Sequence, residues 1–183
     1  MVLAGCAESE PSETPAASGE PLAHRLDQVD AAVAAWSGAA TVAEAHAAAE
    51  EARNLIVGPA GPMYGDADGD GTVRGDIAVG LLPGVEGEEG LAQAEPVNSC
   101  VEADVLGGSW EEPGDRWDTA LAAYEEWTPA SNTMPTLPSH PQRVVGWATF
   151  TLATDDLDAA HEYAGHARIH VGVSRAAVED CGS

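Results

Sequence analysis

The chain has 183 residues, of which 31 are Asp or Glu and 7 are Arg or Lys, and its formal net charge is −24. Because a domain takes about 150 residues, this length is enough for one domain and leaves little room for a second. A surface this acidic lacks the cations that neutralise phosphate groups, which excludes nucleic acid as a partner and excludes a basic patch on an anionic membrane. The apolar fraction of 44% argues against disorder of the whole chain.

Residues 1–21 combine a short motif with a polar tether. The Leu-Ala-Gly-Cys string that ends at Cys6 resembles the lipobox of bacterial and archaeal lipoproteins. This resemblance implies a diacylglyceryl group on the Cys6 thiol, so we expect a protein of the cell envelope, either lipid-anchored to the outer face of the membrane or secreted. A secretory signal needs an apolar segment of about 7–15 residues, which we expect upstream of the motif. Residues 7–21 are rich in Pro, Ser and Glu, a composition that predicts a disordered acidic tether.

The other two cysteines, Cys100 and Cys181, form an even pair once Cys6 is lipidated. In an oxidising compartment such a pair is expected to form a disulfide, which would tie the C-terminus to the middle of the chain. Closing a loop of this length would stabilise the fold by about 4–5 kcal/mol through chain entropy. The alternative is two unrelated thiols.

Apolar residues at helical spacing predict an all-α domain over residues 22–183. The first helix is expected over residues 22–36, and a capping box from Thr41 to Glu44 starts a second helix over residues 42–57. Three further helices are expected over residues 115–128, 141–152 and 154–179. The predicted architecture is a bundle of four to five helices.

A long irregular insertion is expected after the second helix, over residues 58–114. This segment holds many of the glycines, several prolines and few periodic apolar residues, and only residues 101–106 suggest a strand. A long loop within a compact domain is usually functional or stabilised by a ligand.

The insertion contains the strongest chemical motif, an Asp-x-Asp-x-Asp-Gly-x-Val string over residues 66–73. It resembles the first eight positions of an EF-hand loop, which supplies oxygen ligands to Ca²⁺. The predicted calcium ligands are the side chains of Asp66, Asp68, Asp70 and Asp76, with the backbone carbonyl of Thr72.

The match to the EF-hand is incomplete. Position twelve is Ile77 and not Glu, and no helix is predicted directly before or after the loop. We therefore expect a structural site of modest affinity and not a sensor; the alternative is a solvated acidic turn, because Asp and Gly are common in turns. Residues 45–82 as a whole also look like uncharacterised exported helical domains, a likeness that implies no activity.

The histidines suggest a second possible site. His161 and His166 are five residues apart, one more than in the zinc-protease motif, so they do not share a helix face and that motif is excluded. His166 and His170 do lie on neighbouring positions of one face. If the second and fifth helices pack together, a site for Zn²⁺ or another transition metal could form from His46, Glu50, His166 and His170. The alternative is that His170 is a hydrogen-bonded core residue and the others lie at the surface.

The sequence thus favours a non-catalytic binding or structural module of the cell envelope, with a calcium-stabilised loop and a membrane anchor at Cys6. The second hypothesis is a metalloenzyme or metal carrier that uses the histidine cluster. No nucleophile elbow, P-loop or dinucleotide fingerprint is present in the sequence. The five Trp residues are expected to fill the core, because the chain has a single Phe.

Overall fold

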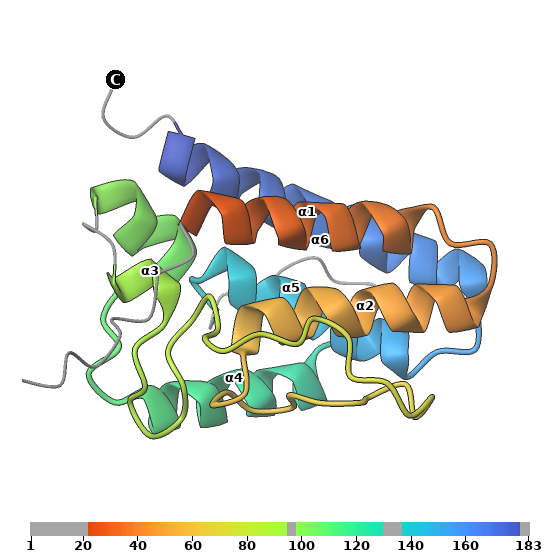
Figure 1. The fold of residues 1–183 in the computed structure, drawn as a ribbon, viewed down its shortest axis with the longest axis horizontal. Helices are drawn as coiled ribbons and strands as arrows, with labels where there is room; N and C mark the ends of the chain where they lie inside the picture. The colour runs from red at the N-terminus through yellow and green to blue at the C-terminus, as the bar shows by residue number, and fades with distance from the viewer. Residues whose placement is uncertain (1–21, 95–97, 130–136, 180–183) are drawn as a thin grey trace, which may run out of the picture.

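The computed structural model describes residues 22–94, 98–129 and 137–179, and over these residues the fold is all-α (Figure 1). No strand occurs among them, which confirms the predicted fold class. The helices are α1 (Leu22–Ser37), α2 (Val42–Val57), α3 (Leu91–Ala94), the π-helix η1 (Val101–Leu106), α4 (Pro113–Glu126), α5 (His140–Leu152) and α6 (Leu157–Glu179).

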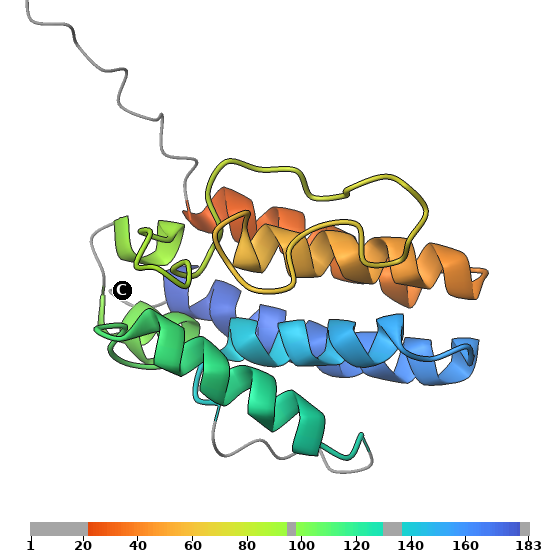
Figure 2. The same cartoon turned by 90° about the horizontal axis from the view of Figure 1, so that it is seen from below.

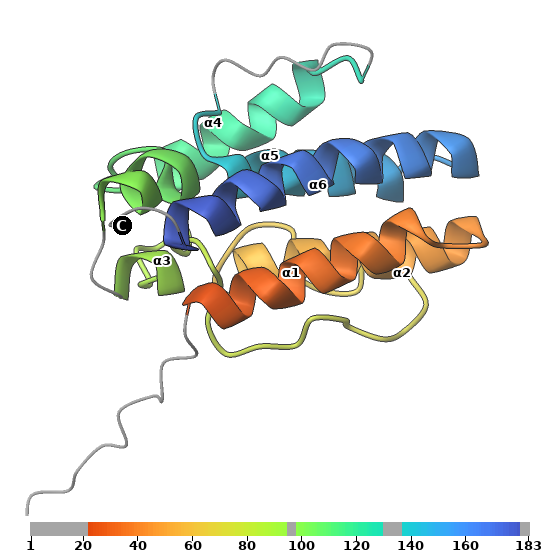
Figure 3. The same ribbon diagram turned by 90° about the horizontal axis from the view of Figure 1, so that it is seen from above.

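Four long helices form the bundle. α1 contacts α2, α2 contacts α5, α5 contacts α6 and α6 contacts α1, so the four helices close a ring around one core. Figure 3 shows two layers, one made by the α1–α2 hairpin and the other by the α5–α6 hairpin. α4 lies outside this ring and packs on α5 (Figure 2).

The core combines many Ala residues with the tryptophans, as predicted. All five Trp side chains are buried, and Trp127 lies edge-on to Trp147 with ring centroids 4.1 Å apart. Small residues on α2 let the neighbouring helices approach, and the large aromatic rings fill the remaining space. The α2 alanines that are buried are Ala45, Ala48, Ala49 and Ala52.

The start and the end of α2 follow from local chemistry. The Thr41 hydroxyl accepts a hydrogen bond from the Glu44 N–H at 3.2 Å, and the Glu44 carboxylate accepts one from the Thr41 N–H at 3.2 Å, so the predicted capping box is present. Gly58 ends the helix with a φ of 63°, which glycine adopts without strain. α2 is thereby fixed in length and direction before the insertion begins.

The insertion returns to the helix that it leaves. After a wide excursion, Leu81 donates its N–H to the Leu55 carbonyl and Leu82 donates to the Ile56 carbonyl, at 3.3 and 3.1 Å. The buried guanidinium of Arg25 on α1 also donates to the Leu55 carbonyl, at 3.2 Å. These bonds satisfy carbonyls at the open end of α2 and fix the insertion against the bundle.

The expected strand over residues 101–106 is wrong, because this segment forms η1. The side-chain oxygen of Asn98 accepts hydrogen bonds from the N–H groups of Cys100 and Val101, at 3.0 and 2.8 Å, and so caps a helical start. Val101 and Val105 are both buried, and their spacing of four residues is helical.

Cys100 is disulfide-bonded. Its predicted partner Cys181 and the predicted lipidation site Cys6 lie outside the described residues, as does the tether over residues 7–21. Within the part of the chain that the structure describes, no helix has both the length and the apolar composition needed to cross a membrane.

Candidate metal centre

The acidic loop lies on α2 and is attached to it by a buried amide. Asn54 is completely buried, and its amide nitrogen donates to the carbonyls of Gly65 and Arg74, at 3.0 and 2.7 Å. Its amide oxygen accepts from the Gly65 N–H at 3.2 Å. One side chain of the helix therefore holds both ends of the segment that carries the three aspartates.

Glu50, one helical turn before Asn54, binds the middle of the same loop. Its side chain is also completely buried. One carboxylate oxygen accepts from the Ala67 N–H and, at 3.1 Å, from the Asp68 N–H. The other carboxylate oxygen accepts from the Arg74 N–H at 2.8 Å. Three N–H donors offset the cost of burying a carboxylate, and charge-assisted bonds of this kind are stronger than neutral ones.

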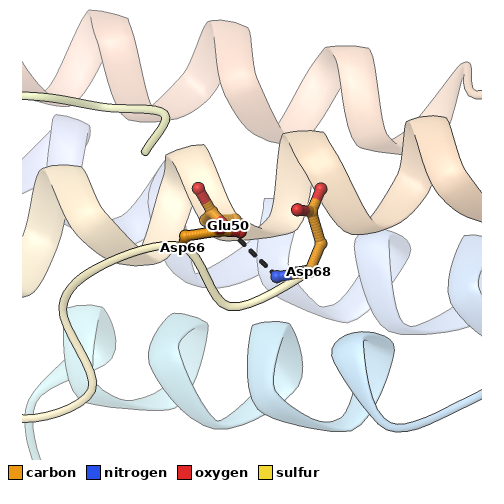
Figure 4. Close-up of side chains that lie close together, drawn as sticks. All are labelled: Glu50, Asp66 and Asp68. Carbon is orange, nitrogen blue, oxygen red and sulfur yellow. Dashed lines mark hydrogen bonds between the residues drawn. The ribbon is translucent and has the colours of Figure 1, made fainter. Parts of the chain in front are cut away.

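Glu50, Asp66 and Asp68 bring their carboxylates together. Figure 4 shows Glu50 on α2 beside the two aspartates of the loop, and one oxygen of each residue lies within 4.8 Å of one oxygen of the others. Glu50 is buried, Asp68 is half-buried and Asp66 is exposed. Three carboxylates at this spacing can hold a metal ion.

Burial raises the pKa of Asp68 above its ordinary value, and the charges of Glu50 and Asp70 add to this effect. The Asp70 N–H and the Arg74 guanidinium act in the opposite direction, but they do not cancel it. The surroundings thus disfavour the ionised form of Asp68. A cation bound between Glu50, Asp66 and Asp68 would offset the repulsion between their carboxylates.

Within the loop, the aspartates fold the backbone around themselves. The two oxygens of Asp66 accept from the N–H groups of Gly69 and Gly71, at 2.8 and 2.9 Å. The two glycines have φ values of 74° and 89°, in the left-handed region that favours glycine. The turn that the sequence motif predicts is therefore formed, with Asp66 at its centre.

The other predicted calcium ligands are not members of the three-carboxylate group. Asp70 pairs with Arg74, whose guanidinium lies 2.7 Å from its carboxylate, and this contact lowers the pKa of Asp70. Asp76 accepts a hydrogen bond from the Tyr64 hydroxyl at 3.1 Å. Thr72 donates its N–H to the Asp70 carboxylate at 2.8 Å. Of the predicted set, Asp66 and Asp68 belong to the group.

The group has access to solvent on one side. A groove of about 300 Å³ runs along α2 and is lined by His46, Asp68, Asp70 and Arg74, together with the small residues Ala43 and Ala47 and with Glu44. An ion and its water ligands can therefore reach the half-buried carboxylate without opening the bundle.

The predicted histidine cluster does not form. His46 donates from Nε2 to the Thr154 carbonyl at 2.9 Å. His166 stacks on Trp147 with ring centroids 4.4 Å apart, and Glu50 is directed to the acidic loop. His170 is buried, as the sequence pattern predicts, but its partner is His140.

Two further histidines, His161 and His140, lie outside the predicted cluster. His161 is half-buried and donates from Nε2 to the Ala39 carbonyl at 2.8 Å. His140 was not singled out, because it follows a Pro-rich connection that carries no periodic pattern. Glu50 belongs with the acidic loop and not with the histidines. The sequence signal for this contact is the polar pair Glu50 and Asn54, which lie four residues apart on the buried face of α2.

Comparisons with protein-family models, with curated proteins and with solved structures found no match to this chain.

Proposed function

We propose that this protein is a non-catalytic binding or structural module of the cell envelope in which Ca²⁺ fixes the acidic loop on α2. The observation that supports this proposal is the convergence of Glu50, Asp66 and Asp68. All three ligands are carboxylates, and hard cations such as Ca²⁺ prefer oxygen ligands, whereas soft metals prefer thiolate.

The geometry favours calcium over magnesium. Two ligands come from a glycine-containing loop and one from a helix, so the site can adjust the separation of its oxygens. Ca²⁺ accepts six to eight oxygens at about 2.3–2.6 Å in flexible arrangements, whereas Mg²⁺ demands a near-ideal octahedron at about 2.0–2.1 Å. Water from the adjoining groove would complete the coordination shell.

The affinity should be modest. The Arg74 guanidinium lies 3.5 Å from Asp68 and 2.7 Å from Asp70, so it already neutralises part of the loop. A dissociation constant of about 10⁻⁴–10⁻³ M, as in extracellular calcium modules, suits a protein that meets a steady supply of the ion.

The test is calorimetric titration of the purified chain with Ca²⁺ and, separately, with Mg²⁺. We expect one Ca²⁺ per chain and a rise in melting temperature with Ca²⁺ concentration. Asp66→Asn and Asp68→Asn should each weaken binding by roughly tenfold or more. Asp76→Asn is the matched control, because Asp76 lies on the same loop but bonds to Tyr64 outside the group. Unchanged Ca²⁺ binding in both variants, or an equal loss in the control, would refute the calcium site.

Anchoring at Cys6 is a separate part of the proposal. Its support is the lipobox-like string at Cys6, the polar residues 7–21, which would hold the bundle away from a bilayer, and the disulfide at Cys100, which is typical of oxidising compartments. The test is mass spectrometry of the protein expressed with a lipoprotein signal segment. We expect the mass of a diacylglyceryl group on Cys6 and its loss in Cys6→Ser; an unmodified Cys6 would contradict the anchor.

A further inference from the structure

A second group of side chains lies at the end of the bundle where α5 begins. His140, the first residue of α5, meets His170 of α6, and their Nδ1 atoms are 2.9 Å apart. On the other side of the His140 ring, Nε2 lies 4.0 Å from a carboxylate oxygen of Asp104 on η1. Three separate elements therefore place a carboxylate and an imidazole next to the His140 ring.

The separation of the two Nδ1 atoms matches a chelate. Imidazole nitrogens bind transition metals at about 2.0–2.1 Å, so two of them in adjacent positions at a right angle are about 2.9 Å apart. Right-angled nitrogen positions are those of square-planar and tetragonal Cu²⁺ and Ni²⁺. We propose that His140 and His170 are paired ligands of a divalent transition metal of the copper or nickel type, with water in the remaining positions.

Asp104 supports this arrangement as a positioning residue. A carboxylate beside Nε2 favours the tautomer that carries its proton on Nε2, and the lone pair of His140 Nδ1 then points toward His170. Metal-binding histidines commonly have a carboxylate near their second ring nitrogen, which orients the ring and strengthens the ligand. At 4.0 Å, Asp104 acts on His140 through its charge and not through a hydrogen bond.

The electrostatic surroundings favour a metal that binds through ligand strength and not through charge. The negative charge of Asp104 attracts a cation to the histidine pair, whereas the Arg143 guanidinium and the His166 ring, which also face the pair, oppose added positive charge. A hard cation such as Ca²⁺ gains little from two neutral nitrogens beside a guanidinium, but Cu²⁺ and Ni²⁺ bind imidazole strongly.

The backbone around Asp104 also supports a functional site. Asp104 lies within the π-helix η1, and π-helical turns are rare and occur frequently at functional sites. The Ser139 hydroxyl donates to the Val105 carbonyl at 2.7 Å and so ties η1 to the start of α5. The carboxylate and the first imidazole are thereby held in a fixed relation.

The test is titration of the full chain with Cu²⁺ and Ni²⁺ in excess Ca²⁺, so that the carboxylate group on α2 is already occupied. We expect one tightly bound ion per chain, and an electron paramagnetic resonance spectrum of the Cu²⁺ form with two coordinated nitrogens. His140→Gln should remove one nitrogen from the spectrum and weaken binding by more than roughly tenfold. Asp104→Asn should weaken it about tenfold without changing the number of nitrogens.

The controls separate a metal site from a structural hydrogen bond. His161 lies on α6, as His170 does, but it donates to the Ala39 carbonyl. His161→Gln should therefore leave the binding of Cu²⁺ and Ni²⁺ unchanged. His140 is half-buried in the first turn of α5, so its substitution is expected to leave the bundle folded, and circular dichroism checks this. If the wild-type chain binds neither ion in stoichiometric amount, or if His140→Gln binds as tightly as wild type, the pair is a hydrogen bond only and the proposal is wrong.

Discussion

Two polar regions interrupt this apolar bundle, and they are built in different ways. The Glu50 carboxylate is surrounded by backbone N–H groups of a loop, whereas His170 is paired with one other side chain, His140. The first region holds charge, because several donors share it. The second avoids charge, because burial keeps both imidazoles neutral. The difference explains why a charged carboxylate can be buried on α2, whereas the polar pair at the start of α5 consists of imidazoles.

The largest effect should come from Glu50→Ala. This change removes the charged acceptor of three partly buried hydrogen bonds, from the N–H groups of Ala67, Asp68 and Arg74, and a hydrogen bond to a charged group contributes about 1.5–3 kcal/mol. We expect the free energy of unfolding to fall by about 3 kcal/mol, measured by urea denaturation without calcium. Glu51→Ala, at the next position of the same helix, is the control and should change stability by less than about 0.5 kcal/mol. Equal losses of stability in Glu50→Ala and Glu51→Ala would show that the hydrogen bonds from the loop to Glu50 do not stabilise the fold.

The second effect tests the neutral histidine pair through pH. Burial, with the neighbouring His140, Arg143 and His166, lowers the pKa of His170 from 6.5 to about 3. Its unfolded form gains a proton near pH 6.5 while the folded form does not, so the stability is present above that pH and is lost as the pH falls toward 3. His170→Gln should flatten the change in urea midpoint between about pH 7 and about pH 5. A variant as pH-sensitive as wild type would show that other groups cause the loss.

Smaller effects on stability, opposite in sign to each other, are expected from substitutions of two glycines, one in the acidic loop and one near His170. Gly71 has a φ of 89°, so Gly71→Ala should destabilise the loop by about 1 kcal/mol through backbone strain, with no atom in the way of the new methyl group. Gly172 lies in α6 near His170, also with open space around it, and Gly172→Ala should stabilise the fold by about 0.5–1 kcal/mol. Thermal unfolding of the two variants should give shifts of opposite sign, and shifts of the same sign would contradict the loop geometry.

The smallest effect on stability is expected for Arg74→Gln. Its ion pairs with Asp68 and Asp70 are partly exposed, so their loss should cost less than about 1 kcal/mol. The same change removes a positive charge beside the carboxylate group, and Ca²⁺ affinity should therefore rise severalfold in calorimetry. Unchanged or weaker Ca²⁺ binding would show that Arg74 does not compete with the ion.

The helices were predictable because their evidence is local. α1 and α2 begin and end within a residue of the predicted limits, since apolar spacing, the Thr41 capping box and Gly58 act over a few residues. The turn at Asp66 was predictable for the same reason. Val101 to Leu106 was misassigned because six residues rich in valine suit a short strand as well as a helix, and the deciding bonds come from Asn98.

The partners of the two polar regions were not predictable, because they meet only in three dimensions. Glu50 and Asp66 are separated by the last two turns of α2 and the irregular residues 58–65, and the contact depends on how the loop folds back onto α2. His140 and His170 lie on different helices, and no spacing rule joins them. The sequence indicated the carboxylates of Asp66 and Asp68 but grouped Glu50 with the histidines.

The return of the insertion to the end of α2 has a consequence for how this protein can change. Gly58 and Gly80 lie so close that a Cβ on Gly58 would collide with the backbone of Gly80. The segment between them therefore leaves the bundle and rejoins it at nearly the same point. Its outer residues can therefore change without moving a helix, whereas Gly65, Ala67, Asp68 and Arg74 supply the hydrogen-bond partners of the buried Asn54 and Glu50. The acidic loop is thus an addition to the bundle that could be lengthened at its outer residues, but its loss would require compensating changes at Glu50 and Asn54.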